Sequence, residues 1–177
     1  MLNVLLLQLP VPNNPGANIP LAAGYLKAWA HKLGLLDRVA IELMPRAIAD
    51  RAGDALLVRE IVRRRPAVLG ISLYTWNSER SLAIAAMVKQ QLPNLKIIVG
   101  GPEVQRNNDW VLQHPAVDIA VDGEGEQTFG ELLLRMLGAP EPASQPWDGA
   151  DRDLAIPLGP RLDGPIAGTI QLVDGAL

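Results

Sequence analysis

Residues 68–77 read VLGISLYTWN, an apolar run that ends in two aromatic rings, a hydroxyl and an amide. A continuous apolar run of this length is typical of a strand that is buried on both faces, as in a parallel sheet. Aromatic residues make up only 4% of the chain, so two rings at the end of one strand are unexpected. Either Tyr74 and Trp76 pack against the protein itself, or they face something that the protein binds.

Apolar runs alternate with segments of helical period on both sides of this stretch. Strands are expected over residues 2–9, 39–44, 68–73, 95–99 and 117–121. Helices are expected over residues 21–33, 50–65, 78–91, 103–113 and 124–137. This order predicts an α/β fold, a doubly wound five-stranded parallel sheet of the flavodoxin-like or Rossmann-like type.

The character of the sequence changes after residue 138. Between residues 139 and 165 Pro, Gly, Asp and Ala dominate and no period is sustained. We therefore expect one compact α/β domain over residues 1–138, followed by a linker or extended C-terminal tail over residues 139–177.

The composition excludes several classes of function. A net charge of -3 argues against nucleic-acid binding, which needs a basic surface. The chain has no cysteine, so it cannot form a disulfide, a thiolate metal site or an iron–sulfur cluster on its own. The first residues do not resemble a signal peptide and no run is long enough to span a membrane. A cytoplasmic location and no membrane partner are the expectation.

Three loops that follow expected strands carry unusual residues. They are residues 74–78 after the third strand, residues 99–103 after the fourth and residues 122–129 after the fifth. Ligands of open α/β sheets bind beyond the carboxyl ends of the strands, where these loops would meet. Gly100 and Gly101 would let the backbone approach a ligand closely, and Pro102 suits the first turn of a following helix. The three loops together predict a ligand groove at this edge.

The loops indicate what kind of ligand the groove would hold. They contain little positive charge, and neither a dinucleotide-binding glycine motif nor a phosphate-binding loop motif is present. A large, flat and partly apolar ligand fits glycines together with aromatic and amide side chains. Two other interpretations remain open on the residues alone. One is a flavodoxin-like domain that stacks a flavin or another flat cofactor on Tyr74 and Trp76, and the other is a non-catalytic interaction domain.

At these loops the chain resembles the cobalamin-binding domain that precedes the catalytic core of cobalamin-dependent radical S-adenosylmethionine enzymes. The resemblance spans residues 1–138. It rests on the Leu-rich first strand and its Pro-rich loop, on residues 71–77, on Val99-Gly100-Gly101-Pro102-Glu103, and on residues 118–126 with their Gly-Glu-Gly-Glu sequence.

The resemblance implies where the cofactor would lie. The corrin ring would cover the carboxyl edge of the sheet, and the nucleotide tail with its dimethylbenzimidazole base would enter the side of the sheet near strands three to five. Ser72 and Leu73 would line the slot for the tail. The full set of implied cofactor-binding residues is Pro12, Asn13, Ser72, Leu73, Tyr74, Thr75, Trp76, Asn77, Gly100, Gly101, Pro102, Glu103, Gly123, Glu124, Gly125, Glu126 and Thr128.

One departure from related cobalamin proteins concerns the lower ligand of cobalt. Mutases and methionine synthase carry an Asp-x-His-x-x-Gly motif after the first strand, and its His ligates cobalt. Here residues 9–18 contain no His, and both His31 and His114 are expected at helix ends. The resemblance therefore implies cobalamin bound base-off without a protein His ligand, with Tyr74–Asn77 against its lower face. No protein metal ligand and no catalytic residue is predicted in this chain.

A second departure concerns catalysis. Radical S-adenosylmethionine enzymes hold a 4Fe-4S cluster with a Cys-x-x-x-Cys-x-x-Cys motif, which this cysteine-free chain lacks. The chain alone is thus not expected to be an enzyme. The resemblance implies that it serves the catalytic domain, in cis or in trans, of a radical S-adenosylmethionine enzyme of the methyltransferase class. That domain would supply the cluster and S-adenosylmethionine.

Overall fold

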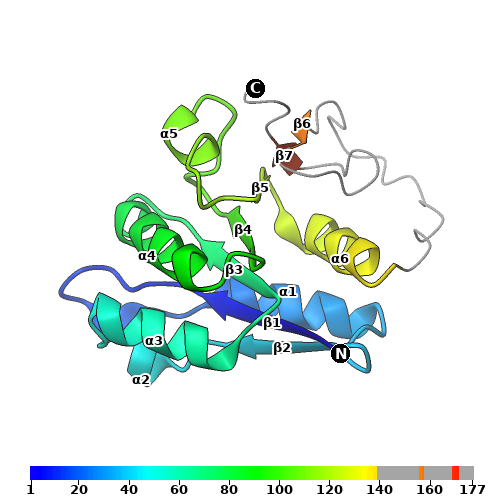
Figure 1. The fold of residues 1–177 in the computed structure, drawn as a ribbon, viewed down its shortest axis with the longest axis horizontal. Coiled ribbons are helices and arrows are strands. Elements are labelled where there is room, and N and C mark those ends of the chain that lie inside the picture. The colour runs from blue at the N-terminus through cyan, green and yellow to red at the C-terminus, as the bar shows by residue number, and fades with distance from the viewer. Residues whose placement is uncertain (139–155, 158–168, 172–177) are drawn as a thin grey trace.

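A computed structural model of the chain describes residues 1–138, 156–157 and 169–171. Its parallel strands are β1 (Leu2–Leu7), β2 (Val39–Leu43), β3 (Val68–Ser72), β4 (Lys96–Gly100) and β5 (Ile119–Val121). They lie side by side in the order β2-β1-β3-β4-β5, which confirms the predicted doubly wound sheet (Figure 1).

Two short strands extend the sheet beyond β5. Strand β7 (Thr169–Gln171) pairs antiparallel with β5, and β6 (Ile156–Pro157) pairs parallel with β7. The remainder of the expected tail, and with it the predicted boundary after residue 138, lies outside the described residues.

The helices connect the parallel strands and form two layers. They are α1 (Leu21–Lys32), α2 (Arg46–Ala49), α3 (Asp54–Arg64), α4 (Ser78–Gln91), α5 (Asp109–Leu112) and α6 (Gly125–Met136), with a short 3-10 turn at Pro15–Ala17. Helix α1 ends two residues before Gly34, which adopts φ +69° in the left-handed region that favours glycine. No helix among these residues is long and apolar enough to cross a membrane.

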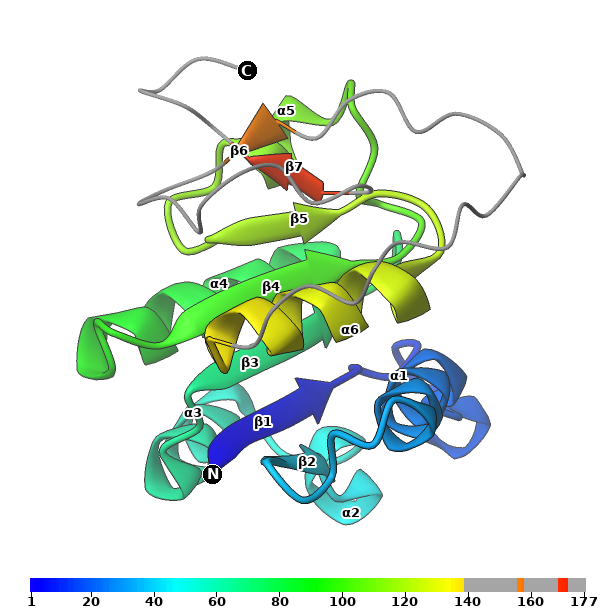
Figure 2. The same cartoon turned by 90° about the vertical axis from the view of Figure 1, so that its right-hand side faces the viewer.

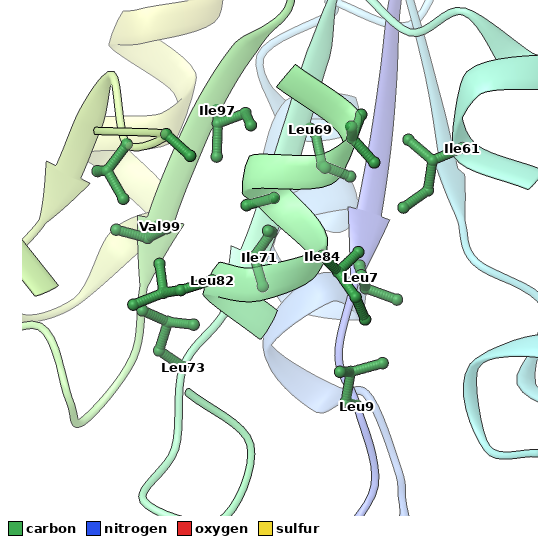
Figure 3. Packing of buried hydrophobic residues seen from close by; sticks show 14 of the residues in the cluster. Leu7, Leu9, Ile61, Leu69, Ile71, Leu73, Leu82, Ile84, Ile97 and Val99 are labelled. Atoms are coloured by element: carbon green, nitrogen blue, oxygen red, sulfur yellow. The ribbon is translucent and has the colours of Figure 1, made fainter. Parts of the chain in front are cut away.

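Alternating side chains of each strand supply the two cores. In β1, Leu5 and Leu7 belong to the core shared with α3 and α4, whereas Val4 and Leu6 belong to the core shared with α1 and α6. Figure 2 shows α6 in front of the strands and α3 and α4 behind them. In Figure 3, Leu82 and Ile84 of α4 pack over side chains of β3 and β4. Burial on both faces explains why these strands are continuously apolar.

Two helix predictions need correction. The helix expected over residues 103–113 is wrong for most of its length, because only Asp109–Leu112 is helical and Pro102 lies in a turn instead of a helix. The apolar stripe is interrupted there: Asn107 and Asn108 occupy positions where a helix would need apolar contacts, and Asn residues favour turns. The helix expected over residues 50–65 begins only at Asp54, after the extended Gly53, and the short helix α2 before it was not predicted.

The two-layer packing yields a stability prediction with an adjacent control. Leu57 of α3 is completely buried, while its neighbour Leu56 is 37% exposed. Leu57→Ala should lower the free energy of unfolding by about 2–5 kcal/mol, because it removes buried methyl groups and leaves a cavity. Leu56→Ala makes the same change in helix propensity and should lower the free energy of unfolding much less. Equal losses for both variants in urea unfolding would contradict the assigned packing.

Candidate functional site

The order of the strands places a switch point between β1 and β3. The chain leaves β1 toward α1 on one face of the sheet and leaves β3 toward α4 on the other. Loops diverge at such a point, so a crevice opens beyond the carboxyl ends of the strands. The loops after β1, β3, β4 and β5 all lie at this edge.

A cavity of about 230 Å³ opens at this edge on the α1/α6 face. Its floor comes from the strands, its walls from the two helices and its rim from the loops. The floor residues are Leu6, Gly70, Ser72, Ile98, Gly100 and Val121. The wall residues are Ala22, Ala23, Leu26 and Phe129. The rim residues are Tyr74, Gly101 and Gly123–Glu126. Among the residues that the structure describes, no Lys or Arg lines the cavity.

Missing side chains create the space in the floor. Gly100 pairs with Ser72 across β3 and β4 and with Val121 across β4 and β5. A Cβ atom built on Gly100 would meet only Val121, at 3.8 Å, so the position faces open space. Any larger side chain at Gly100 would therefore project into the cavity.

The glycine at the rim has a different role. Gly101 adopts φ +108°, and a Cβ atom there would lie 2.6 Å from the carbonyl oxygen of Leu73. The loops after β3 and β4 thus touch through their backbones, a contact that only glycine permits. The Leu73 side chain itself is completely buried in the α3/α4 core and does not line the cavity.

Asn77 holds the loop after β3 in place. Its side chain is 2% exposed, its Oδ1 accepts a hydrogen bond from the Tyr74 amide at 2.9 Å, and its Nδ2 donates to the Leu9 carbonyl at 3.0 Å and the Ser72 carbonyl at 3.3 Å. One side chain therefore connects the ends of β1 and β3 across the switch point.

Further polar contacts continue along the rim. The Thr75 hydroxyl donates to Glu103 Oε1 at 2.6 Å, which ties the loop after β3 to the loop after β4. Arg106 donates to Asp122 at 3.3 Å and so reaches the end of β5. These contacts place Thr75 and Glu103 beside the cavity without making them part of its lining.

The two aromatic rings pack against each other. Tyr74 and Trp76 are stacked with centroids 4.7 Å apart and planes 9° from parallel. Tyr74 lines the cavity, whereas Trp76 is 45% exposed. The pair presents an exposed aromatic face at the carboxyl edge, next to the cavity.

A polar group that the sequence did not point to fixes the loop after β1. Gln8 Nε2 donates to Asn18 Oδ1 at 2.8 Å, and Asn18 Nδ2 donates to Asp50 at 2.7 Å and to the Gln8 carbonyl at 3.2 Å. Asn18 is buried, and these contacts anchor the Pro-rich loop to α2 and its end. An Asn in a loop rich in Pro, Asn and Gly gave no signal of this role.

The predicted site residues fall into two groups. The structure gathers around the cavity Ser72, Tyr74, Gly100, Gly101, Gly123, Glu124, Gly125 and Glu126. The other predicted residues do not line the cavity; they are Pro12, Asn13, Leu73, Thr75, Trp76, Asn77, Pro102, Glu103 and Thr128. Pro12 and Asn13 are exposed in the loop after β1, and Thr128 is buried within α6. The walls from α1 and α6 were not predicted from the sequence, because tertiary contacts bring these helices to the cavity.

Neither histidine lies near the cavity. His31 is exposed in the last turn of α1, and His114 precedes β5, so both are at the amino edge of the sheet. Burial lowers the pKa of His114 below its ordinary value, and its Nδ1 accepts a hydrogen bond from the Ala116 amide at 3.3 Å. Within the described residues no three His, Cys, Asp or Glu side chains are grouped so as to hold a metal ion.

Comparison with known families and proteins gives a consistent result. The model of the family described as "B12 binding domain" matches residues 17–133. The cobalamin-dependent radical SAM methyltransferase TokK of Streptomyces tokunonensis is 31% identical over 173 residues, covering 90% of this chain and 24% of that protein. The 2-(S-pantetheinyl)-carbapenam-3-carboxylate methyltransferase of Streptantibioticus cattleyicolor is 35% identical over 127 residues, covering 67% of this chain and 17% of that protein. The chain thus spans about a quarter or less of the length of these relatives.

Solved structures share the fold. The cobalamin-dependent S-adenosylmethionine radical enzyme OxsB, with aqua-cobalamin and S-adenosylmethionine bound, superposes with a TM-score of 0.64 at 19% identity, over 80% of this chain and 19% of that chain. The radical S-adenosylmethionine methyltransferase TsrM of Kitasatospora setae, with cobalamin and a [4Fe-4S] cluster bound, gives a TM-score of 0.61 at 14% identity, over 78% of this chain and 27% of that chain.

The hydrogen bonds of Asn77 lead to a prediction about the rim. Asn77→Ala leaves the buried Leu9 and Ser72 carbonyls without this donor, which should cost about 1–3 kcal/mol of stability. It should also speed hydrogen exchange of the Tyr74 amide, because that amide loses its acceptor. Asn107→Ala, a matched change at an exposed position, should alter neither quantity. Unchanged exchange at Tyr74 in the Asn77 variant would show that the side chain does not hold this loop.

Proposed function

Since this chain belongs to the B12-binding domain family, we propose that it binds cobalamin base-off at the carboxyl edge of its sheet. The nucleotide tail enters the α1/α6 cavity, and the corrin ring lies outside it over the loops. The observation that carries this proposal is the cavity itself, with its glycine floor and apolar walls.

The size of the cavity supports this division of the ligand. Its volume of about 230 Å³ is below the range of roughly 300–1,000 Å³ that encloses a whole drug-sized ligand. It is several times the share of one water molecule, which is about 30 Å³. The space therefore suits one aromatic base with its linker and excludes a corrin ring. The open position at Gly100 provides the slot in which such a base fits.

The rim would support the corrin. In the proposal Trp76, stacked on Tyr74, shields the lower face of the ring, and Asn77 positions both through the loop. Gly101 and Gly123–Glu126 border the ring and its amide side chains, with Thr75 and Glu103 holding the rim from behind. When bound, cobalamin supplies a cobalt centre that can accept and release a methyl group. The chain's own residues orient the ring and exclude water from its lower face.

The lower face would carry no histidine ligand. Both histidines of the chain lie at the opposite edge of the sheet, and the loop after β1 contains none. The space that such a ligand would fill lies beside the exposed face of Trp76 in this proposal.

The wider role extends beyond this chain. We propose that the chain is the cofactor domain of a radical S-adenosylmethionine methyltransferase, whose catalytic domain, in cis or in trans, holds a 4Fe-4S cluster and S-adenosylmethionine. The similarity to two methyltransferases of greater length supports this role, and the absence of cysteine assigns the cluster to the other domain. The proposal retains the cytoplasmic location expected from the sequence.

The base-off, His-free state has a spectroscopic test. The chain is reconstituted with hydroxocobalamin, desalted and reduced to Co(II), and its electron paramagnetic resonance spectrum is recorded. We expect retained cobalamin whose spectrum lacks nitrogen superhyperfine splitting, because no nitrogen ligates the lower face. Free cobalamin at neutral pH, with its base on cobalt, serves as the control that shows the splitting. Splitting in the protein-bound sample would contradict the proposed coordination.

The place of Trp76 is tested against a second exposed tryptophan. Trp76 is 45% exposed and Trp110, on α5 in the opposite layer, is 51% exposed. Trp76→Ala should weaken cobalamin binding about tenfold, because it removes an aromatic surface from a planar ligand. Trp110→Ala should bind as the unaltered chain does in the same absorbance titration. If the two variants match in affinity and spectrum, Trp76 does not contact the ring.

A further inference from the structure

We propose that the α1/α6 cavity selects among cobamides by their lower base, accepting dimethylbenzimidazole and other apolar bases and disfavouring purines. This inference rests on the proposed function, since it concerns the same cavity. It assigns to Gly100 and the apolar residues around it a role in specificity.

The deep part of the cavity offers mainly hydrocarbon. Leu6 and Ile98 flank Gly70 in the floor, and Val121 flanks Gly100. Phe129 lines it from α6 and is buried. An apolar bicyclic base gains by entering such a space, because apolar surface is removed from water on both partners.

Hydrogen-bonding groups are scarce at that depth. Backbone groups of the inner strands are engaged in the parallel ladder, in which Gly70 pairs with Ile98 and Ser72 with Gly100. The Gly100 carbonyl accepts from the Leu73 amide at 2.7 Å. The Ser72 hydroxyl is left as the one polar side chain among the floor residues.

A purine base places more polar groups than this floor can satisfy. Adenine carries an exocyclic amine and several ring nitrogens; a single hydroxyl can donate to one ring nitrogen and accept from the amine, which leaves the other ring nitrogens without a donor. The carboxylates of Glu124 and Glu126 stand at the start of α6, at the mouth of the cavity. A base whose amine bonded to these carboxylates would stay at the mouth, outside the apolar part of the cavity. Burying polar groups without partners is unfavourable, so adenine should bind less well.

The coordination chemistry of cobalt acts in the opposite direction. Adenine is a weaker base than dimethylbenzimidazole and leaves cobalt more readily, so base-off binding costs an adenine cobamide less. A preference for dimethylbenzimidazole therefore cannot arise from the ease of removing the base. It would have to come from the cavity.

The experiment compares ligands that differ only in the lower base or lack it. The chain is titrated with cobalamin, with the adenine-containing cobamide, with the p-cresol-containing cobamide and with cobinamide, which has no base, and binding is followed by absorbance. We expect the adenine cobamide to bind about tenfold to a hundredfold more weakly than cobalamin. The p-cresol cobamide, apolar and never coordinated, should bind at least as tightly as cobalamin.

A variant pair locates the selectivity in the floor. Gly100→Leu should fill the slot and weaken cobalamin binding to the level of cobinamide, while cobinamide binding itself stays unchanged. Gly24→Leu adds the same side chain on the exposed face of α1, where a Cβ atom meets nothing within 4 Å, and should leave all four affinities unchanged. Thermal unfolding of both variants checks that each remains folded.

The outcomes separate the inference from the proposed function. Tight binding of cobalamin together with equally tight binding of the adenine cobamide would overturn the base selectivity alone. Cobalamin binding that Gly100→Leu leaves intact in a folded variant would overturn the role of the floor. Failure to bind any of the four ligands would contradict the proposed function and the inference with it.

Discussion

The pairing of Ser72 with Gly100 on the α1/α6 face of the sheet is the constraint on which the site depends. A parallel sheet between two helical layers must normally fill both faces with side chains, since interiors are closely packed. At Gly100 the strands provide no side chain toward α1 and α6, and the two helices do not close the remaining gap. On the opposite face Leu69, Ile97 and Val99 all point into the α3/α4 core and are fully buried there. The asymmetry between the layers locates the cavity on one of them.

The rim depends on a second set of constraints, which are polar. Asn77 joins the ends of β1 and β3, Thr75 joins the loop after β3 to Glu103, and Gly101 lets two loops touch through their backbones. These contacts fix the loops without placing polar side chains in the cavity. Residues around the cavity are therefore of two kinds: some shape the cavity, and others hold the loops around it.

Much of this arrangement could be predicted from the sequence, and the reasons for the failures are physical. Continuous apolar runs such as residues 68–73 identified the parallel strands, because strands buried on both faces show no alternation. The glycines and acids after β4 and β5 indicated the edge of the sheet at which the cavity lies. Leu73 was grouped with Ser72 although neighbouring strand residues face opposite layers, and its side chain lies in the α3/α4 core instead. The helical walls and Asn18 were missed because their roles come from tertiary contacts. Residues 103–108 were assigned to a helix despite the two asparagines that follow Arg106.

The central claim is that the space between α1, α6 and the floor receives the base of cobalamin. A diamagnetic Co(III) form of the complex permits nuclear Overhauser measurements between the base protons and protein methyl groups. The account predicts contacts from the dimethylbenzimidazole protons to the methyl groups of Ile98 and Val121, which belong to the α1/α6 face. A complex that retains cobalamin but shows no contact between the base and either residue would contradict it.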